Sequence, residues 1–244
     1  MSVPLARRAA AEALGTGVLV AVVVGSGIQA TRLTGDVGLQ LLANSLATVF
    51  GLGVLIVLLG PVSGAHLNPV VTLVAWWSGR GTGDGPSSPE AAAYLAAQAV
   101  GAVGGAILAD AMFDRPWVAW STHDRSAPHL WLSEVVATAG LLWLIGGLTR
   151  TGRTHLAAPA VAAYIGAAYW FTSSTSFANP AVTLGRAFTD TFAGIAPAGV
   201  PAFVAAQLAG AVLGIGLTTL TFGRDSGPAD IPQPARPEEG VLTP

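Results

Sequence analysis

Six long apolar stretches, separated by short polar ones, account for most of the chain. Each is near the length of about 20 residues that a helix needs to cross a bilayer core, and they lie at about 9–30, 39–60, 90–113, 131–149, 156–172 and 199–222. The pattern predicts six membrane-spanning helices. Two further apolar stretches, after Asn68 and after Asn179, are too short to cross the core, and we predict that each forms a half-helix.

Both short stretches begin with an Asn-Pro pair, in LNPVVTL from Leu67 and in ANPAVTL from Ala178. Asparagine is a favoured N-cap and proline is favoured at the first helical position, so both helices should begin at these prolines. A helix N-terminus carries partial positive charge and N–H groups that have no partner within the helix. Two such ends inside a membrane predict a pore or a binding site between them.

The order span, span, half-helix, span occurs twice along the chain. Glu12 in the first span matches Glu134 in the fourth, and YLAAQAVGAV at 94–103 matches FVAAQLAGAV at 203–212. Because three spans is an odd number, the second copy must lie inverted relative to the first. In such inverted repeats, discontinuous helices meet near the midplane of the membrane.

The repeats suggest one membrane domain and a tail. We expect repeat one at about 5–113 and repeat two at about 130–223, within a single domain at 1–223. The segment 224–244 is rich in proline and poor in apolar residues, so we expect a disordered tail. With the N-terminus inside, seven arginines fall on the cytoplasmic side and three outside, as the positive-inside rule requires. Both termini, and the tail, are therefore expected in the cytoplasm.

Composition narrows the function classes. The chain is 52% hydrophobic and 10% charged, against roughly 25% charged residues in soluble domains, which indicates an integral membrane protein in contact with lipid. Scattered arginines and a net charge of −2 argue against nucleic-acid binding. The absence of cysteine excludes thiol catalysis and thiolate metal sites, and the four histidines lack metal-ligand spacing. No nucleophile-base pair or cofactor loop is present, so we expect no enzyme activity and no cofactor.

The paired motifs resemble a known family. Two Asn-Pro half-helices, each preceded by a glutamate-bearing span and followed by a span with the sequence AAQ, resemble the major intrinsic proteins, the aquaporins and aquaglyceroporins, over about residues 5–223. The resemblance implies an all-α membrane protein with six transmembrane helices plus two re-entrant half-helices in an inverted repeat. It also implies a passive channel and a homotetramer with one pore in each subunit.

The resemblance assigns roles to single residues. Asn68 and Asn179 would donate side-chain N–H groups to the permeating molecule, while Pro69 and Pro180 would stack where the half-helices meet. Backbone carbonyls would line the pore in file at Gly64, Ala65, His66, Ser174, Thr175 and Ser176. Glu12 and Glu134 would accept hydrogen bonds from the re-entrant segments.

From the residues alone, two other interpretations stay open. Asn68 and Asn179 could cap their helices without touching a solute. Glu12 and Glu134 could relay protons, because acids inside a membrane are functional candidates by default. In that case the chain would be an ion-coupled transporter, a class that also uses inverted repeats and broken helices.

The chain departs from the family pattern at two places. The first motif has Val70 where alanine is usual, whereas the second keeps Ala181. Family members usually carry arginine directly after the second motif, and here that position is Val182. Arg186 lies four residues on, one helical turn outward, where we expect it to extend into the outer vestibule. By the family's spacing, the selectivity filter is expected at Thr48, Ala167, Ser176 and Val182.

A filter of small residues without arginine should pass neutral solutes larger than water, because pore diameter and lining donors set such selectivity. In this respect the chain is similar to bacterial aquaglyceroporins with valine after the second motif, a branch linked to arsenite as neutral As(OH)₃. The resemblance implies glycerol-like polyols, arsenite and antimonite as solutes, and the inner membrane of a bacterium as location. A water-selective channel and a closed structural membrane protein are the remaining alternatives.

Overall fold

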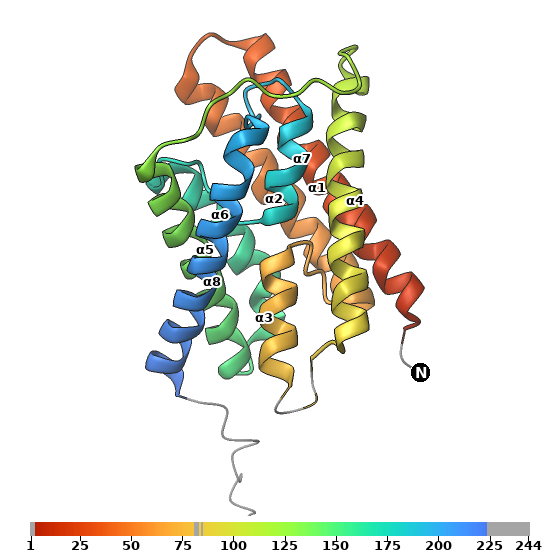
Figure 1. Ribbon diagram of the computed structural model, residues 1–244, viewed down its shortest axis with the longest axis vertical. Coiled ribbons are helices and arrows are strands. Elements are labelled where there is room, and N and C mark those ends of the chain that lie inside the picture. The colour runs from red at the N-terminus through yellow and green to blue at the C-terminus, as the bar shows by residue number, and fades with distance from the viewer. Residues whose placement is uncertain (1–2, 81–82, 84, 224–244) are drawn as a thin grey trace, which may run out of the picture.

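The computed structural model describes residues 3–80, 83 and 85–223, and within that part of the chain all regular structure is helical (Figure 1). The tail expected at 224–244 lies outside the described residues. Most helices stand roughly side by side, and the two shorter helices α3 and α7 lie one above the other near the middle of the view (Figure 1).

Five helices are long and apolar enough to cross a membrane. They are α1 (Leu5–Leu33), α2 (Val37–Ser63), α4 (Ser88–Met112), α5 (Pro128–Arg150) and α8 (Val200–Phe222), the last preceded by the 3-10 turn η3 (Pro197–Gly199).

The sixth predicted span is α6 (Ala157–Phe171), which has only 15 residues. The 3-10 turn η1 (Thr154–Leu156) precedes it directly. At about 1.5 Å per α-helical residue and about 2.0 Å per 3-10 residue, the two together extend about 28 Å. This is close to the core thickness of about 30 Å, so the six predicted spans are all present.

The two half-helices begin at the predicted prolines. They are α3 (Pro69–Gly79) and α7 (Pro180–Gly185), the latter continued by the 3-10 turn η2 (Arg186–Phe188). The side chain of Asn68 accepts a hydrogen bond from the Val70 N–H, and that of Asn179 accepts from the N–H groups of Ala181 and Val182. The N-terminal ends of α3 and α7 face each other halfway along the molecule (Figure 1).

Within each repeat, the first and last spans cross with their backbones in contact. A Cβ atom on Gly101 or Gly105 of α4 would lie 2.1 Å from the Ala13 carbonyl oxygen or 2.0 Å from that of Gly17, both on α1. The same arrangement joins α5 to α8, where glycines of α8 lie against backbone carbonyls of α5. Small residues at helical spacing therefore permit these close crossings, as is usual between membrane helices.

The linker between the repeats, residues 113–127, lies against the segment that follows α7. Its backbone donates from Ala119 to the Phe188 carbonyl and from Ser121 to the Ala187 carbonyl, both at 3.1 Å. In Figure 1 this linker passes across the end of the molecule to which the C-terminal end of α7 points. It therefore helps to shape that end of the molecule.

Candidate functional site: a central cavity between the two half-helices

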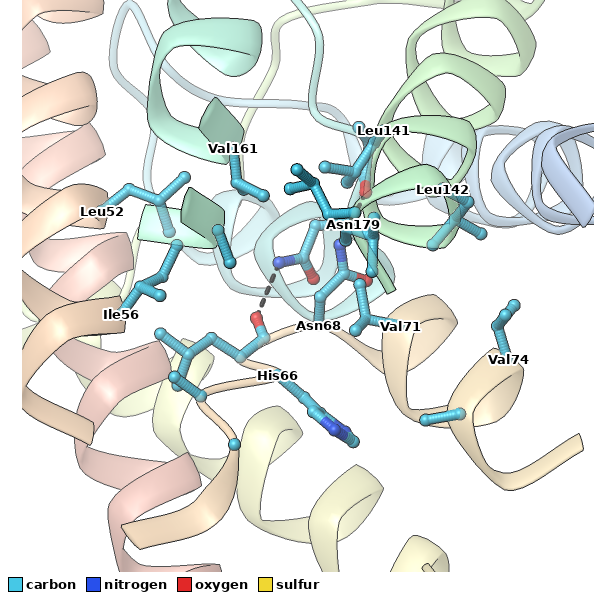
Figure 2. A pocket seen from close by; sticks show the side chains of 18 of the residues that line it. Leu52, Ile56, His66, Asn68, Val71, Val74, Leu141, Leu142, Val161 and Asn179 are labelled. Atoms are coloured by element: carbon cyan, nitrogen blue, oxygen red, sulfur yellow. Dashed lines mark hydrogen bonds between the residues drawn. The ribbon is translucent and has the colours of Figure 1, made fainter. Parts of the chain in front are cut away.

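A cavity of about 1000 Å³ lies between the two repeats, and both half-helices contribute to its lining. It follows α6 from Ala157 to Tyr169, a rise of about 18 Å at 1.5 Å per residue. Figure 2 shows Asn68 and Asn179 side by side at its centre, with apolar side chains such as Leu52, Ile56 and Val161 around them.

The two asparagines tie the repeats together at that point. Asn68 Nδ2 donates to the Ala178 carbonyl, and Asn179 Nδ2 donates to the Leu67 carbonyl, both at 2.8 Å. Each amide carries a second N–H group, which has no protein acceptor in the part of the chain that the structure describes. Because both asparagines line the cavity, two uncharged donors are available to its contents.

The segments before the two motifs contain left-handed backbone at equivalent places. In the first, φ is 86° at Gly64, 47° at Ala65 and 48° at Leu67. The second segment repeats this with positive φ values at Thr175, Ser176 and Ala178. Such conformations cost about 1–3 kcal/mol at non-glycine residues and persist only where the surroundings enforce them.

The predicted file of carbonyl-bearing residues agrees only in part with the cavity lining. Gly64, Ala65 and His66 line the cavity, but in the second segment the lining begins at Ser176. Ser174 and Thr175 are not part of that lining, and a file of carbonyls that includes them stays a prediction. Ser174 is fully buried, and its hydroxyl donates to the Glu134 carboxylate at 2.6 Å.

Glu12 holds the first segment through four hydrogen bonds. Its Oε1 accepts from the Ser63 hydroxyl at 2.6 Å and from the His66 N–H at 2.9 Å. Its Oε2 accepts from the Leu67 N–H at 2.7 Å and from Gln98 Nε2 at 2.8 Å. The carboxylate is fully buried and does not line the cavity.

Glu134 makes the same four contacts in the second repeat. It accepts from the Ser174 hydroxyl, the N–H groups of Phe177 and Ala178, and Gln207 Nε2, at 2.6–2.9 Å. Glu134 is likewise buried and outside the cavity lining. Both glutamates thus contact the re-entrant segments and not the cavity.

Three of the four expected filter residues, Thr48, Ser176 and Val182, line the cavity. Ala167 does not, because it lies on the exposed face of α6, and its selection was wrong. Tyr169 lines the cavity instead, and its hydroxyl oxygen lies 3.0 Å from Thr48 Oγ1. The sequence signal for this face was the four-residue spacing of the larger side chains Val161, Ile165 and Tyr169.

Arg186 is also placed differently from the expectation. It does not extend into solvent: its side chain is buried, lines the cavity, and donates from Nε to the Ala193 carbonyl. Its guanidinium carbon lies 3.4 Å from the centre of the Phe177 ring. Arg125, from the linker, lies 5.1 Å from the centre of the same ring and was not singled out from the sequence.

The chemistry of the cavity is that of a polar path through an apolar lining. Among the described residues, no group of three or more histidine, aspartate and glutamate side chains could hold a metal ion. The lining offers amide N–H groups, hydroxyls, the imidazoles of His66 and His155, and the guanidinium groups of Arg150 and Arg186, which can form hydrogen bonds to a small solute.

Comparison with known proteins gives a consistent picture. Residues 1–176 match the family model described as major intrinsic protein. The chain is similar to the aquaglyceroporin AqpS of Rhizobium meliloti (strain 1021), with 51% identity over 234 residues, 96% of this chain and 93% of the relative. It is also similar to the propanediol uptake facilitator PduF of Citrobacter freundii, with 29% identity over 58% of this chain and 59% of that protein.

A solved structure shares the fold. The X-ray structure of the aquaglyceroporin from Plasmodium falciparum superposes with a TM-score of 0.62, covering 89% of this chain and 95% of that chain. The two sequences are 22% identical, so this likeness bears on the fold alone.

Proposed function

Since the chain belongs to the major intrinsic protein family and is thus a multi-pass membrane channel for small solutes and not an enzyme, we propose that it conducts neutral solutes larger than water. The proposed solutes are glycerol-like polyols and the neutral hydroxides of trivalent arsenic and antimony, together with water itself. The central cavity is the proposed pathway.

The observation that carries this proposal is the pair of asparagine amides at the centre of the cavity. Asn68 and Asn179 each keep one N–H group free of protein acceptors in the described residues, and both lie at helix N-termini. Two donors beside the positive ends of two helix dipoles suit a hydroxyl-rich neutral solute and oppose a cation. Carbonyls of the re-entrant segments would accept hydrogen bonds from the solute's hydroxyl groups.

Val182 supports a solute larger than water. At this position valine presents neither charge nor hydrogen-bond donors, whereas arginine would add a bulky group with five donors. Thr48 and Ser176, which also line the cavity, add hydroxyl groups of small side chains. Tyr169, whose hydroxyl oxygen lies 3.0 Å from Thr48 Oγ1, adds a bulky side chain to the lining, and we propose that rotation of the tyrosine hydroxyl exchanges its partner for the passing solute.

We further propose a homotetramer in the inner membrane of a bacterium, with both termini in the cytoplasm. The distribution of arginines between the loops supports this orientation. Two of the relatives, AqpS and PduF, come from bacteria. Since the chain lacks cysteine, single cysteines introduced at exposed Asp124 and Arg153 would report the side of each loop by labelling.

Stopped-flow permeability of reconstituted protein to water, glycerol and arsenite, measured side by side, tests the proposal. We expect glycerol and arsenite fluxes well above those of protein-free liposomes. Asn179→Asp should abolish both, because aspartate keeps the cap but replaces the amide donors with a charged acceptor. Flux of water alone would favour a water-selective channel, and near-normal solute flux in Asn179→Asp would show that this asparagine only caps its helix.

A further inference from the structure

Two arginines are buried together near the outer end of the cavity. Arg186 belongs to η2 and is 3% exposed, and Arg125 belongs to the linker and is 8% exposed. Both guanidinium groups lie near the ring of Phe177, at 3.4 Å and 5.1 Å from its centre. Segments far apart in the sequence thus bring two positive charges to one aromatic side chain.

Neither charge is neutralised by an ion pair within the described residues. Arg186 Nε donates to the Ala193 carbonyl, and Arg125 Nε donates to the Gly194 carbonyl at 2.9 Å. Burial lowers the pKa of Arg125 to about 10, which still leaves it protonated at neutral pH. Burying charges without counter-ions is unfavourable, so their retention calls for a function.

The two arginines differ in their relation to the cavity. Arg186 lines it together with Thr48, Tyr169 and Val182, whereas Arg125 is not part of the lining. A guanidinium has five N–H donors, and in the described part of the chain only the Nε–H of Arg186 has a protein acceptor. Four N–H groups therefore remain for molecules in the cavity.

We propose that Arg186 is a specificity-determining residue of the channel, which supplies from one turn beyond Val182 the charge and the donors that Val182 lacks. The carbonyl of Ala193 and the ring of Phe177 hold its guanidinium at the cavity wall. Solute oxygens accept hydrogen bonds from it, while its charge excludes protons and metal cations. This inference rests on the proposed function, because it assigns selectivity to the same pathway.

This arrangement separates the width of the opening from its positive charge. An arginine directly after the second motif would fix both at one position. Val182 leaves the wall beside the motif apolar, whereas Arg186 keeps a positive charge at the same cavity. A neutral solute can then pass a wider opening that still repels cations. Arg125 strengthens the repulsion from behind the Phe177 ring without entering the path.

The test compares Arg186→Met with the parent protein in liposomes, under an imposed potassium diffusion potential and with a pH-sensitive dye inside. We expect the proton leak to rise at least about tenfold, which corresponds to about 1.4 kcal/mol of lost barrier, while glycerol still permeates. The matched control is Arg32→Met, because Arg32 is an exposed outer arginine that stacks on Phe113 and does not line the cavity. It should leave the leak unchanged.

A second-site rescue separates charge from structure. Val182→Arg in the Arg186→Met background should restore the low proton leak, because it returns a guanidinium to the cavity without the contacts to Ala193 and Phe177. A variant leak equal to that of the parent would overturn the inference. So would a raised leak that Val182→Arg does not lower.

The result that refutes the role of Arg186 differs from the result that refutes the proposed channel function. A parent that passes neither water nor glycerol refutes the proposed function, whereas the proton leak decides the role of Arg186 independently of any glycerol flux. If Arg186→Met fails to insert, Arg186→Gln takes its place, since glutamine removes the charge but keeps a polar side chain with N–H donors. A proton leak raised at least severalfold supports the inference, and a leak equal to that of the parent overturns it.

Discussion

At the residue scale, Val182 and Arg186 together decide what the cavity presents beyond the second motif. Val182 N–H donates to the Asn179 side chain, so this residue is fixed in the first turn of α7. Its side chain lines the cavity and is 5% exposed. A substitution here changes the wall of the path directly, and the cap need not change because it uses only the backbone of Val182.

We predict that Val182→Arg reduces glycerol and arsenite permeability at least tenfold, about 1.4 kcal/mol of added barrier, and reduces water permeability less. A second guanidinium would narrow the opening and face Arg186, whose charge repels it. Stopped-flow measurements give the ratio of solute to water permeability, and Val182→Ala serves as a control of the same polarity. An unchanged arsenite-to-water ratio in a correctly inserted Val182→Arg protein would place the selective ring elsewhere.

Residues whose role depends on local chemistry could be predicted from the sequence. Asn68 and Asn179 carry their own signal, an N-cap followed by proline, and duplication reinforced it. Ala167 was assigned to the filter by its number of residues before the second motif. The turn at 172–175 lies between the two, so this spacing does not determine which face of α6 meets the cavity. Arg125 lies in a linker without periodicity, so only the folded chain brings it to Phe177.

At the scale of elements, the re-entrant segments are held by the carboxylates of α1 and α5. Each carboxylate oxygen of Glu134 accepts one backbone N–H, from Phe177 or from Ala178, in addition to one side-chain donor. These bonds enforce the left-handed backbone at Ser176 and Ala178. Because the two backbone N–H groups donate to different oxygens, the position requires a side chain with two acceptor oxygens, which a carboxylate provides.

We predict that Glu134→Gln lowers the midpoint of thermal unfolding and the solute flux. Whichever way the amide turns, its NH₂ group faces one of the two backbone N–H groups, which costs about 1–3 kcal/mol for the buried donor left without an acceptor. Asp114→Asn is the matched control, since Asp114 is exposed and asparagine tolerates its left-handed φ of 56°. Equal midpoints for the two variants would show that Glu134 does not stabilise the segment.

The crossing of α1 and α4 gives a prediction with a neighbouring control. Gly105→Ala should lower the unfolding midpoint markedly, because the new Cβ would lie 2.0 Å from the Gly17 carbonyl oxygen and force the helices apart. Gly104→Ala should be neutral or stabilising, because nothing lies within 4 Å of its Cβ position. Thermal unfolding in detergent compares the two, and similar losses for both would exclude close packing as the cause.

At the scale of the whole molecule, each repeat completes the other. The asparagine at the N-terminus of each half-helix donates a hydrogen bond to a backbone carbonyl of the other repeat's re-entrant segment. The centre of the cavity therefore forms only when both repeats are packed together. The inverted order of spans was predictable, because the repeats share glutamate, Asn-Pro and AAQ signals at matching places. The shape of the end of the molecule where the linker lies was not, since it depends on how the linker and η2 fold against each other.

No aspartate or glutamate lines the cavity within the described residues, and the two membrane-embedded glutamates are occupied by the re-entrant segments. A proton relay through membrane-embedded acids needs such an acid on the solute path, and the titratable side chains that line this cavity include instead His66, His155, Tyr169, Arg150 and Arg186. The cavity therefore suits passive movement driven only by the solute's own gradient.

Glycerol flux into liposomes of the reconstituted protein, measured with and without an imposed proton gradient, tests this central claim most directly. The account predicts that flux follows the glycerol gradient in either case, and that a proton gradient applied at equal glycerol concentrations moves none. Accumulation of glycerol driven by the proton gradient alone would contradict the account.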